Sequence, residues 1–562
     1  MIRAWCARSG DVVTRTTLAA LPRERARMSA SDTTRDVAGS VSSLSAFVPA
    51  EATALGHRVG RATLPYVVVE HAPRGGLVVE RGGFGGRPVY VRCERDVVLA
   101  STDLTWVLDA ARALGVRWSS SSLDPDRLAA ECILDAGAVG RTETLFRGIR
   151  EVPPGMRAEL VPGRMTLAAL PPPRLDDAPG AHDVKRLRAL LFAATERAVG
   201  GSSHVGVLTG GGLDSGALLA MAHTFARRLD AFAIDFEGPG DDRPHLVALA
   251  RTVGIEPVRV KPSEALLPAE LTAAGMPLTW PSAAVEATLL ARARDAGASR
   301  VLAGLGADEW FDGDPDAASL LLSGAGLRSA MSTAQVFEQA GRRRALARVL
   351  WPPVRREVPW LLRRMTRRLR SRVEVPAWAG SRTKRVIAES HERALADKPW
   401  VELTAEERVL AGFRDPHLAR ASMLRLQLER LAGILRVDPY LDADVATFAL
   451  SASPELLLGQ DDPRERRGLF REALRGVLPE SVRTRQDKAS FAPVNRALFQ
   501  PPLLATLEKA AAARVSRLAD LQIVEPKAFL AAYASVVSGA GKEALVAQLY
   551  AVLAVETFLA PW

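Results

Sequence analysis

The amino-acid sequence predicts an α/β protein of two domains, and three observations lead to this fold class. Short apolar runs separated by Gly, Pro and Asp precede a Pro-rich break at Pro171–Asp183, and helical stretches alternating with β-branched runs follow it. The first pattern is typical of a β-rich domain, and the alternation favours βαβ units around a parallel sheet. We expect one domain over residues 1–175 and a second over 183–562, with an Arg-rich helical insertion at about 320–430.

Within the first domain the predicted strands are short and closely spaced, and a helix at Leu104–Leu114 lies among them. The strands are expected at Tyr66–Glu70, Gly76–Glu80, Pro88–Arg92, Val97–Ala100 and Arg157–Val161.

The positive charge of the chain is concentrated in one region. Lys and Arg number 74 and Asp and Glu 64, which gives a net charge of +10. Residues 341–388 contain 15 basic and 2 acidic residues, a local charge of +13 that leaves −3 for the rest. This stretch includes an amphipathic helix around Trp360–Leu369, and three interpretations are open: a solvated face, a docking surface for an acidic peptide or partner protein, or contact with RNA or membrane.

Several function classes are unlikely on composition. The cysteines Cys6, Cys93 and Cys132 provide neither a disulfide framework nor a CxxC metal site, and Cys93 is expected to be a core thiol. The N-terminus lacks the apolar core of a signal peptide, and no run reaches the roughly 18 apolar residues of a spanning helix. We expect a cytoplasmic protein with no membrane span and, because the charge is local, no nucleic-acid partner.

The segment Val205–Ala220 carries the strongest signal for a ligand. An apolar run ends in three glycines, Gly210–Gly212, and an amphipathic helix with Asp214 in its first turn follows. A strand that leads through glycines into a helix lets backbone amides approach a phosphate, and the helix dipole favours the anion. Asp214 is then placed to hold a divalent metal that bridges the phosphates.

A second segment, Val301–Gly313, repeats this arrangement. An apolar strand is followed by a turn with Gly304 and Gly306 and by the acids Asp308 and Glu309. Because the carboxyl ends of parallel strands meet at one edge of a sheet, the two turns should face each other where α/β folds bind ligands. The strand predicted at Ala231–Gly238 lies between them in sequence and could line an adenine pocket.

Four motifs in this order resemble the asparagine synthetase and β-lactam synthetase superfamily. TGGGLDSG (209–216) resembles the SGGxDS pyrophosphate loop of N-type ATP pyrophosphatases, and GLGADEWFDG (304–313) resembles GxGxDExFGG. Arg436–Asp442 resembles RxPFLD, and Leu478–Phe491 resembles the LPxxVxxRxK segment. One departure is Gly210, which stands where the loop has Ser; Thr209 is the neighbouring hydroxyl that could compensate.

The resemblance implies a site for ATP and Mg²⁺. It implies that Asp214 and Asp308 hold Mg²⁺ and that Lys488 steadies the acyl-adenylate while an amine attacks, which agrees with the need of acyl transfer for a fixed cation. The residues that it implies for nucleotide binding are Leu208, Gly210, Gly211, Gly212, Asp214, Ser215, Ile234, Gly304 and Gly306, with Leu208 and Ile234 beside the adenine.

The N-terminal half resembles the glutaminase-like domain of asparagine synthetases, an Ntn-type β-sandwich. GGFGGRPVYV (82–91) is similar to DxxGxRPLYY, and ETLFRGIREVPPG (143–155) is similar to TLFxGIxxLPPG. A working glutaminase of this type uses a cysteine at residue 2, whose own amine acts as base. Here Ile2 stands at that position, and the NGE element is impossible because Asn495 is the only Asn. The resemblance therefore implies a degenerate domain that releases no ammonia.

Without ammonia the amine must come from elsewhere, as in β-lactam synthetases and lasso-peptide cyclases. The Arg-rich stretch followed by Val375–Trp378 looks more like the cyclases. We therefore predict an ATP-dependent lasso-peptide macrolactam synthetase, which adenylates an Asp or Glu side chain of a precursor peptide and couples it to the peptide's N-terminal amine, releasing AMP and pyrophosphate. The partners implied are the precursor peptide, a leader peptidase and a leader-recognition protein.

Other functions remain open. One is a β-lactam synthetase-type or ammonia-dependent asparagine synthetase-type amide ligase, and another is a non-catalytic peptide-binding scaffold. RNA thiolation needs a cysteine after the ATP loop, and none follows Cys132. Glu429 and His417 are candidates for the base that deprotonates the amine, although each is more commonly an ordinary helix-surface residue.

Overall fold

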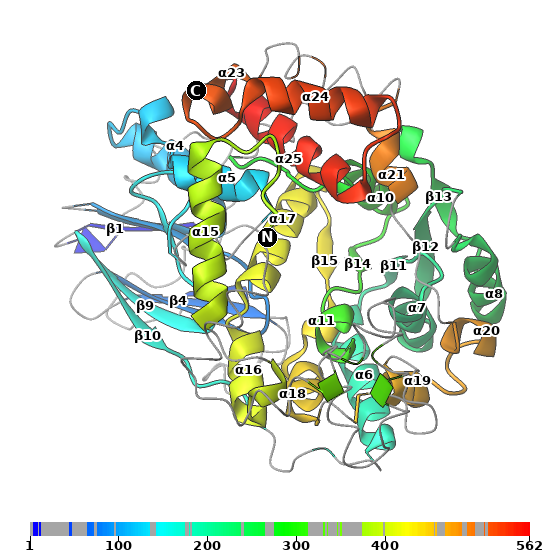
Figure 1. The fold of residues 1–562 in the computed structure, drawn as a ribbon. Coiled ribbons are helices and arrows are strands. Elements are labelled where there is room, and N and C mark those ends of the chain that lie inside the picture. The colour runs from blue at the N-terminus through cyan, green and yellow to red at the C-terminus, as the bar shows by residue number, and fades with distance from the viewer. Residues whose placement is uncertain are drawn as a thin grey trace.

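The structure is a computed structural model. It describes residues 4–8, 11–12, 44–47, 65–71, 76–94, 97–134, 142–174, 179, 183–237, 241–264, 275–312, 330–331, 334, 346, 349–350, 374–396, 400–453, 456–457, 467–485, 492–500, 508, 511 and 515–562. Within these ranges the chain forms three five-stranded sheets, two antiparallel and one parallel, with helices around them (Figure 1). The predicted α/β class is confirmed. None of the described helices is both long enough and apolar enough to cross a membrane.

The two antiparallel sheets form the N-terminal half. Their strand orders are β2-β1-β7-β6-β8 and β10-β9-β5-β4-β3. Buried side chains from both sheets, among them Val79, Val91 and Leu160, form one core cluster, as expected for two sheets packed face to face. The strands are β1 (Ala4–Arg8), β2 (Asp11–Val12), β3 (Leu44–Phe47), β4 (Tyr66–His71), β5 (Leu77–Gly82), β6 (Tyr90–Cys93), β7 (Val97–Ser101), β8 (Arg150–Glu151), β9 (Met156–Val161) and β10 (Arg164–Ala169).

The parallel sheet has the order β13-β12-β11-β14-β15. The chain passes from β11 outward to β12 and β13, and then places β14 and β15 on the other side of β11. The carboxyl ends of β11 and β14 therefore flank the point where the winding changes direction, and open α/β sheets bind their ligands at such a point. The strands are β11 (His204–Leu208), β12 (Arg228–Ile234), β13 (Val258–Val260), β14 (Arg300–Leu302) and β15 (Leu435–Val437).

Helices cover both faces of this sheet because its side chains alternate between two cores. Val207 and Leu302 belong to a cluster with α6, α7 and α8, whereas Phe232 and Val301 belong to one with α10 and α17. The helices of this region are α6 (Val184–Val199), α7 (Leu213–Phe225), α8 (Arg243–Val253), α10 (Ala283–Asp295), α11 (Ala307–Phe311), α16 (Ala405–Phe413), α17 (Pro416–Ala432), α18 (Ala443–Ser451), α19 (Gly468–Ala473) and α20 (Glu480–Arg483).

The two halves share one core. Helix α5 of the N-terminal half packs against α15 and α25 of the C-terminal region. Its residues Leu128 and Cys132 are fully buried in the same cluster as Phe558. The remaining helices are α4 (Leu104–Ala113), α5 (Pro125–Cys132), α15 (Ser381–Ala396), α21 (Ala492–Ala497), α23 (Ser516–Asp520), α24 (Pro526–Val537) and α25 (Glu543–Leu559), with 3-10 turns at Ser120–Ser122, Pro262–Glu264, Trp400–Glu402 and Pro439–Leu441.

Candidate functional site

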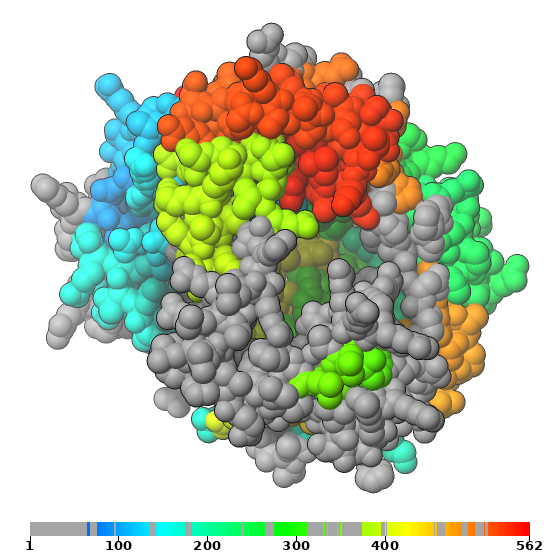
Figure 2. Space-filling view, in the orientation of Figure 1, coloured from blue at the N-terminus to red at the C-terminus, as the bar shows by residue number. Residues whose placement is uncertain are grey.

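A cavity of about 430 Å³ opens at the carboxyl ends of β11, β12 and β14. Figure 2 shows that this face of the molecule is hollowed at its centre, beside α15 and below α25. We call the part with Gly210–Gly212, Asp214 and Asp308 the turn end, and the part with Trp280, Glu286 and Arg425 the helix end. The apolar part of the wall consists of Leu208, Phe232, Ile234, Phe236 and Leu289.

The turn after β11 requires glycine at residue 211. Gly211 has a φ of +87°, and a Cβ there would lie 2.5 Å from the backbone nitrogen of Leu246. Gly212, by contrast, precedes α7 with a φ of −74°, and an added Cβ would meet no described atom within 4 Å. The N-terminus of α7 therefore opens to the cavity, with backbone amides and a helix dipole that suit an anion.

Hydroxyl groups hold this turn closed. The Gly210 N–H donates to Ser215 Oγ at 3.2 Å, and Thr209 Oγ1 lies 3.4 Å from the same oxygen. The Gly211 N–H also donates to Thr209 Oγ1, at 3.4 Å. Thr209 thus places a hydroxyl within the turn, as the sequence suggested for a loop that has Gly210 where serine is expected.

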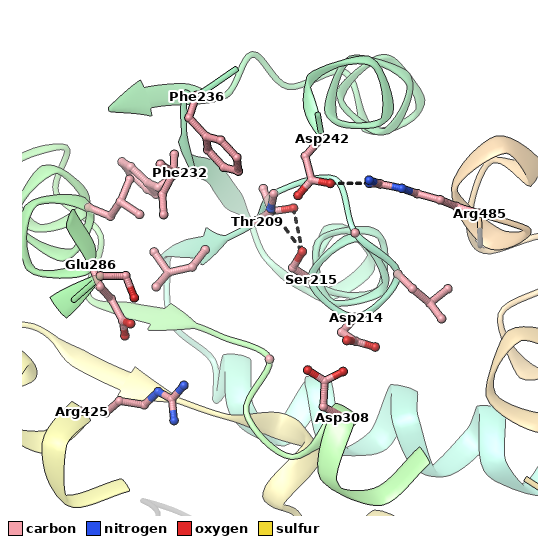
Figure 3. A pocket seen from close by; sticks show the side chains of 18 of the residues that line it. Thr209, Asp214, Ser215, Phe232, Phe236, Asp242, Glu286, Asp308, Arg425 and Arg485 are labelled. Carbon is pink, nitrogen blue, oxygen red and sulfur yellow. Dashed lines mark hydrogen bonds and ion pairs between the residues drawn. The ribbon is translucent and has the colours of Figure 1, made fainter. Parts of the chain in front are cut away.

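The glycine at 210 leaves room for a neighbouring ion pair. A Cβ on Gly210 would lie 2.8 Å from Oδ2 of Asp242, just before α8. Asp242 pairs with Arg485, and both side chains line the cavity (Figure 3). A larger residue at 210 would therefore press on the carboxylate that holds Arg485 in place.

Three carboxylates meet one guanidinium at the turn end. Arg467 Nη1 donates to both carboxylate oxygens of Asp214 at 2.6 and 2.8 Å, and its Nε donates to Asp312 at 2.7 Å. Its Nη2 pairs with Asp308. Asp214 and Asp308 come from α7 and α11, and Figure 3 shows their carboxylates facing each other. The structure thus brings together the two acids that the sequence analysis paired.

Asp214 and Asp308 suit a magnesium ion only when the ion also binds a ligand such as a phosphate. Among the residues that the structure describes, no group of three or more His, Cys, Asp or Glu could hold a metal by itself. Mg²⁺ is usually bound by one or two carboxylates together with phosphate oxygens and water. Asp214 and Asp308 supply two such oxygen donors beside the open N-terminus of α7, so they suit a magnesium ion that arrives with phosphates.

The segment Arg436–Asp442 braces both turns. Asp438 Oδ1 accepts a hydrogen bond from the Leu305 N–H at 3.1 Å, which holds the turn after β14. The Tyr440 hydroxyl donates to the Asp214 carbonyl at 2.8 Å and so supports the start of α7. This motif therefore acts on the site by positioning its two turns.

Arg425 of α17 lies at the helix end. Its guanidinium carbon is 5.6 Å from the centroid of the Trp280 ring, and Arg425 makes no hydrogen bond or ion pair to any residue that the structure describes. Burial lowers the pKa of Arg425, and the charge of Arg436 lowers it further. Arg436 pairs with Glu286, the nearby acid of the cavity wall.

The two candidates for an amine base do not line the cavity. Glu429 pairs with Arg87 of the N-terminal half at 2.8 Å, and burial raises its pKa. His417 lies in the first turn of α17, where its backbone N–H donates to the Asp415 carboxylate at 2.7 Å. Glu429 therefore contributes to the contact between the two halves.

The asparagine synthase family model matches residues 186–560, a range that contains both turns, the facing acids and the bracing segment. The chain belongs to the asparagine synthase family. Members of this family are ATP-dependent ligases, so family membership assigns ATP binding and, in general terms, amide ligation to this chain. A comparison with curated proteins finds no match.

Most of the residues predicted from the family resemblance line the cavity: Leu208, Gly210, Gly212, Asp214, Ser215, Ile234, Gly304 and Asp308. Two do not. Gly211 lies behind the first turn, and Gly306, with a φ of +106°, packs against Leu441 and Trp310. Glycine at these two positions allows the backbone of each turn to adopt a positive φ. Lys488 lies outside the described residues, so its role stays a prediction.

Sequence reasoning missed Glu286, Arg425, Arg467 and Trp280. Arginine is common in this chain, and the motifs of the asparagine synthase family gave no reason to choose these two arginines among 74 basic residues. Within the Arg-rich stretch the structure describes residues 346, 349–350 and 374–388, whereas the helix predicted at Trp360–Leu369 lies outside the described residues. Within α15, Arg382 and Arg385 pair with Asp126 of α5 at 2.7 and 2.6 Å. These two arginines therefore connect the halves of the molecule.

Proposed function

We propose that this protein is an ATP-dependent lasso-peptide macrolactam synthetase. One observation carries the proposal: an asparagine synthase-type nucleotide cavity is joined to a half whose sequence lacks the residues for releasing ammonia. Asn495 is the only asparagine of the sequence, so the glutaminase NGE element is missing from that half. The amine must then arrive with the substrate, and a peptide with a free N-terminus carries both amine and carboxylate. The domain boundaries near residues 175 and 183, and the Ntn-type origin of the N-terminal half, are parts of this proposal.

The reaction has two steps. A carboxylate oxygen of an Asp or Glu side chain attacks the α-phosphorus of ATP, the bond to the bridging oxygen breaks, and pyrophosphate leaves. The N-terminal amine then attacks the acyl carbon and loses a proton, AMP leaves with the electron pair, and an isopeptide bond closes the ring.

The chain's own residues position these steps. The amides of Gly210–Gly212 and the N-terminus of α7 bind phosphate oxygens, and the apolar wall around Leu208 and Ile234 holds the adenine. Mg²⁺, held by Asp214 and Asp308, would neutralise charge on the leaving pyrophosphate. Lys488 would stabilise the acyl-adenylate and the charge that develops as the amine attacks.

The test is mass spectrometry of peptide products. The full-length protein is incubated with MgATP and synthetic peptides that have a free N-terminal amine and one internal Asp or Glu, as a leader peptidase would release them. The proposal predicts loss of one water together with AMP formation. The same peptides with an acetylated N-terminus, or with Asn or Gln in place of the acid, should give no ring.

The remaining outcomes identify the other functions. Amide formation from free aspartate and ammonia, or from a carboxyethyl-amino acid, without any peptide product would establish a small-molecule amide ligase instead. Peptide binding without ATP–pyrophosphate exchange for any peptide would point to a non-catalytic scaffold. Lys488→Met should impair ring closure in a folded protein, and wild-type turnover in this variant would refute its role.

A further inference from the structure

We propose that Arg425 binds the substrate carboxylate that is to be adenylated. This inference rests on the proposed function only for the identity of the peptide, because any acyl-adenylate-forming ligase must hold a carboxylate next to the α-phosphate of ATP. It adds a recognition site for the acyl group at the helix end of the cavity.

Arg425 differs from the other arginines of the cavity in its partners. The other arginines of the cavity are engaged: Arg467 with the carboxylates at the turn end, Arg485 with Asp242 and Arg471 with the backbone carbonyl of Arg483. Arg425 has no hydrogen-bonding or ion-pairing partner among the described residues, and its Nε is buried. A desolvated cation without a partner is costly, and an anion that enters the cavity would offset this cost.

The acids near Arg425 bind other groups. Glu286 is paired with Arg436, and Asp438 accepts from both Arg436, at 2.8 Å, and the Leu305 N–H. Glu309 accepts from the Gly306 N–H at 2.9 Å. These acids favour the charged form of Arg425 from a distance but bind other groups. The guanidinium therefore keeps its donors for a ligand.

The position of Arg425 in the cavity favours a carboxylate as its ligand. Figure 3 shows the guanidinium of Arg425 directed into the cavity on the side of Asp308, away from Phe236 and Asp242. Pyrophosphate belongs at the turn end, where the amides and the carboxylates for magnesium lie. A planar fork of donors lying over the Trp280 ring matches a carboxylate, which accepts two parallel hydrogen bonds. The carboxylate would then lie between Arg425 and the phosphorus that it attacks.

The experiment measures binding without turnover. N-acetyl-aspartate N-methylamide and its asparagine counterpart are titrated into the full-length protein in the presence of Mg²⁺ and the α,β-methylene analogue of ATP, which cannot release pyrophosphate. The wild type should bind the acid about tenfold more tightly than the amide, as expected for one charge-assisted contact. Arg425→Met should bind the two compounds within about twofold of each other, and Arg425→Lys should retain part of the preference.

Two controls separate recognition from other effects. Affinity for the ATP analogue should be unchanged in Arg425→Met, which also shows that the variant folds. Arg251→Met removes an exposed arginine of α8 and should behave as the wild type. Equal binding of acid and amide by the wild type would overturn the inference, and so would a loss of nucleotide affinity in Arg425→Met, which would assign the cation to ATP.

The inference and the proposed function can fail separately. If no peptide is cyclised but the acid preference depends on Arg425, the carboxylate site stands and the peptide substrate is wrong. If peptides are cyclised and Arg425→Met leaves the KM for peptide unchanged, the proposed function stands and the assignment of Arg425 is wrong.

Discussion

The charged side chains at the two ends of the cavity differ in whether they are paired. At the turn end the carboxylates of Asp214, Asp308 and Asp312 are paired with Arg467, whereas at the helix end Arg425 has no such partner among the described residues. A ligand at the turn end must exchange contacts that the protein already makes. A ligand at the helix end only adds contacts. This difference indicates that the turn end can regulate the access of a metal–phosphate ligand. The helix end, by contrast, is suited to select an anion.

The largest effect on activity is expected when a carboxylate is removed from the turn end. Asp214→Asn should lower peptide-dependent ATP–pyrophosphate exchange by about 10³-fold or more, because charge stabilisation by a bound metal contributes several kcal/mol. Asp295→Asn, at an exposed position where α10 ends, is the matched control and should retain wild-type exchange. Comparable rates for the two variants would remove Asp214 from the site.

A pair of glycine substitutions separates the shape of the turn from its contact with ligand. Gly211→Ala should lower the free energy of unfolding by about 1–3 kcal/mol, since its φ is +87° and a Cβ would crowd the Leu246 backbone. Gly212→Ala should unfold like the wild type but bind ATP about tenfold more weakly, because its Cβ enters the path of the phosphates. Thermal unfolding and nucleotide titration measure the two effects, and the opposite pattern would contradict the geometry.

Removal of the Arg467 guanidinium tests whether this side chain offsets the negative charge of the turn end. Arg467→Met removes the guanidinium that three carboxylates share, so their mutual repulsion increases and the melting temperature should be lower than that of the wild type by a few degrees without divalent metal. Addition of Mg²⁺ should restore more stability to the variant than to the wild type, because the variant has one positive charge fewer beside the same three carboxylates. Arg251→Met serves again as the control, and an identical response of all three proteins to Mg²⁺ would show that Arg467 does not compete with the metal.

The smallest effect is expected far from the cavity, at the contact between the halves. Burial raises the pKa of Asp126, but hydrogen bonds from Arg385 and Arg382 outweigh it and hold the pKa below the ordinary value of 3.8. The ion pair therefore stabilises the fold above that value and is lost as the pH falls through the lower value of the folded state. Asp126→Asn should reduce stability at neutral pH by less than about 1 kcal/mol, since the pair is partly exposed.

The free energies of unfolding of Asp126→Asn and the wild type should converge as the pH is lowered below 3.8. Exchange activity should not change. A difference in stability that grows on acidification would have the wrong sign and would contradict this account of the pair.

The comparison also explains what sequence reasoning could find. The two turns, the strands that lead into them and the pairing of Asp214 with Asp308 were predictable, because glycine, apolar runs and acids follow one another within a few residues. Arg467 was not, because it lies 253 positions after Asp214 and meets it only in the folded chain. Arg425 was missed for the same reason: its significance depends on which neighbours are already paired, and no local pattern encodes that.

The shared core of the two halves has a consequence for the history of the chain. Leu128, Cys132 and Phe558 are buried together, so deletion of the N-terminal half would leave α15 and α25 with a broad apolar surface facing water. Loss of a catalytic activity from the N-terminal half is therefore tolerated by selection much more easily than loss of the half itself. The N-terminal half is therefore expected to act as a scaffold that covers this apolar surface, whether or not it retains an activity of its own.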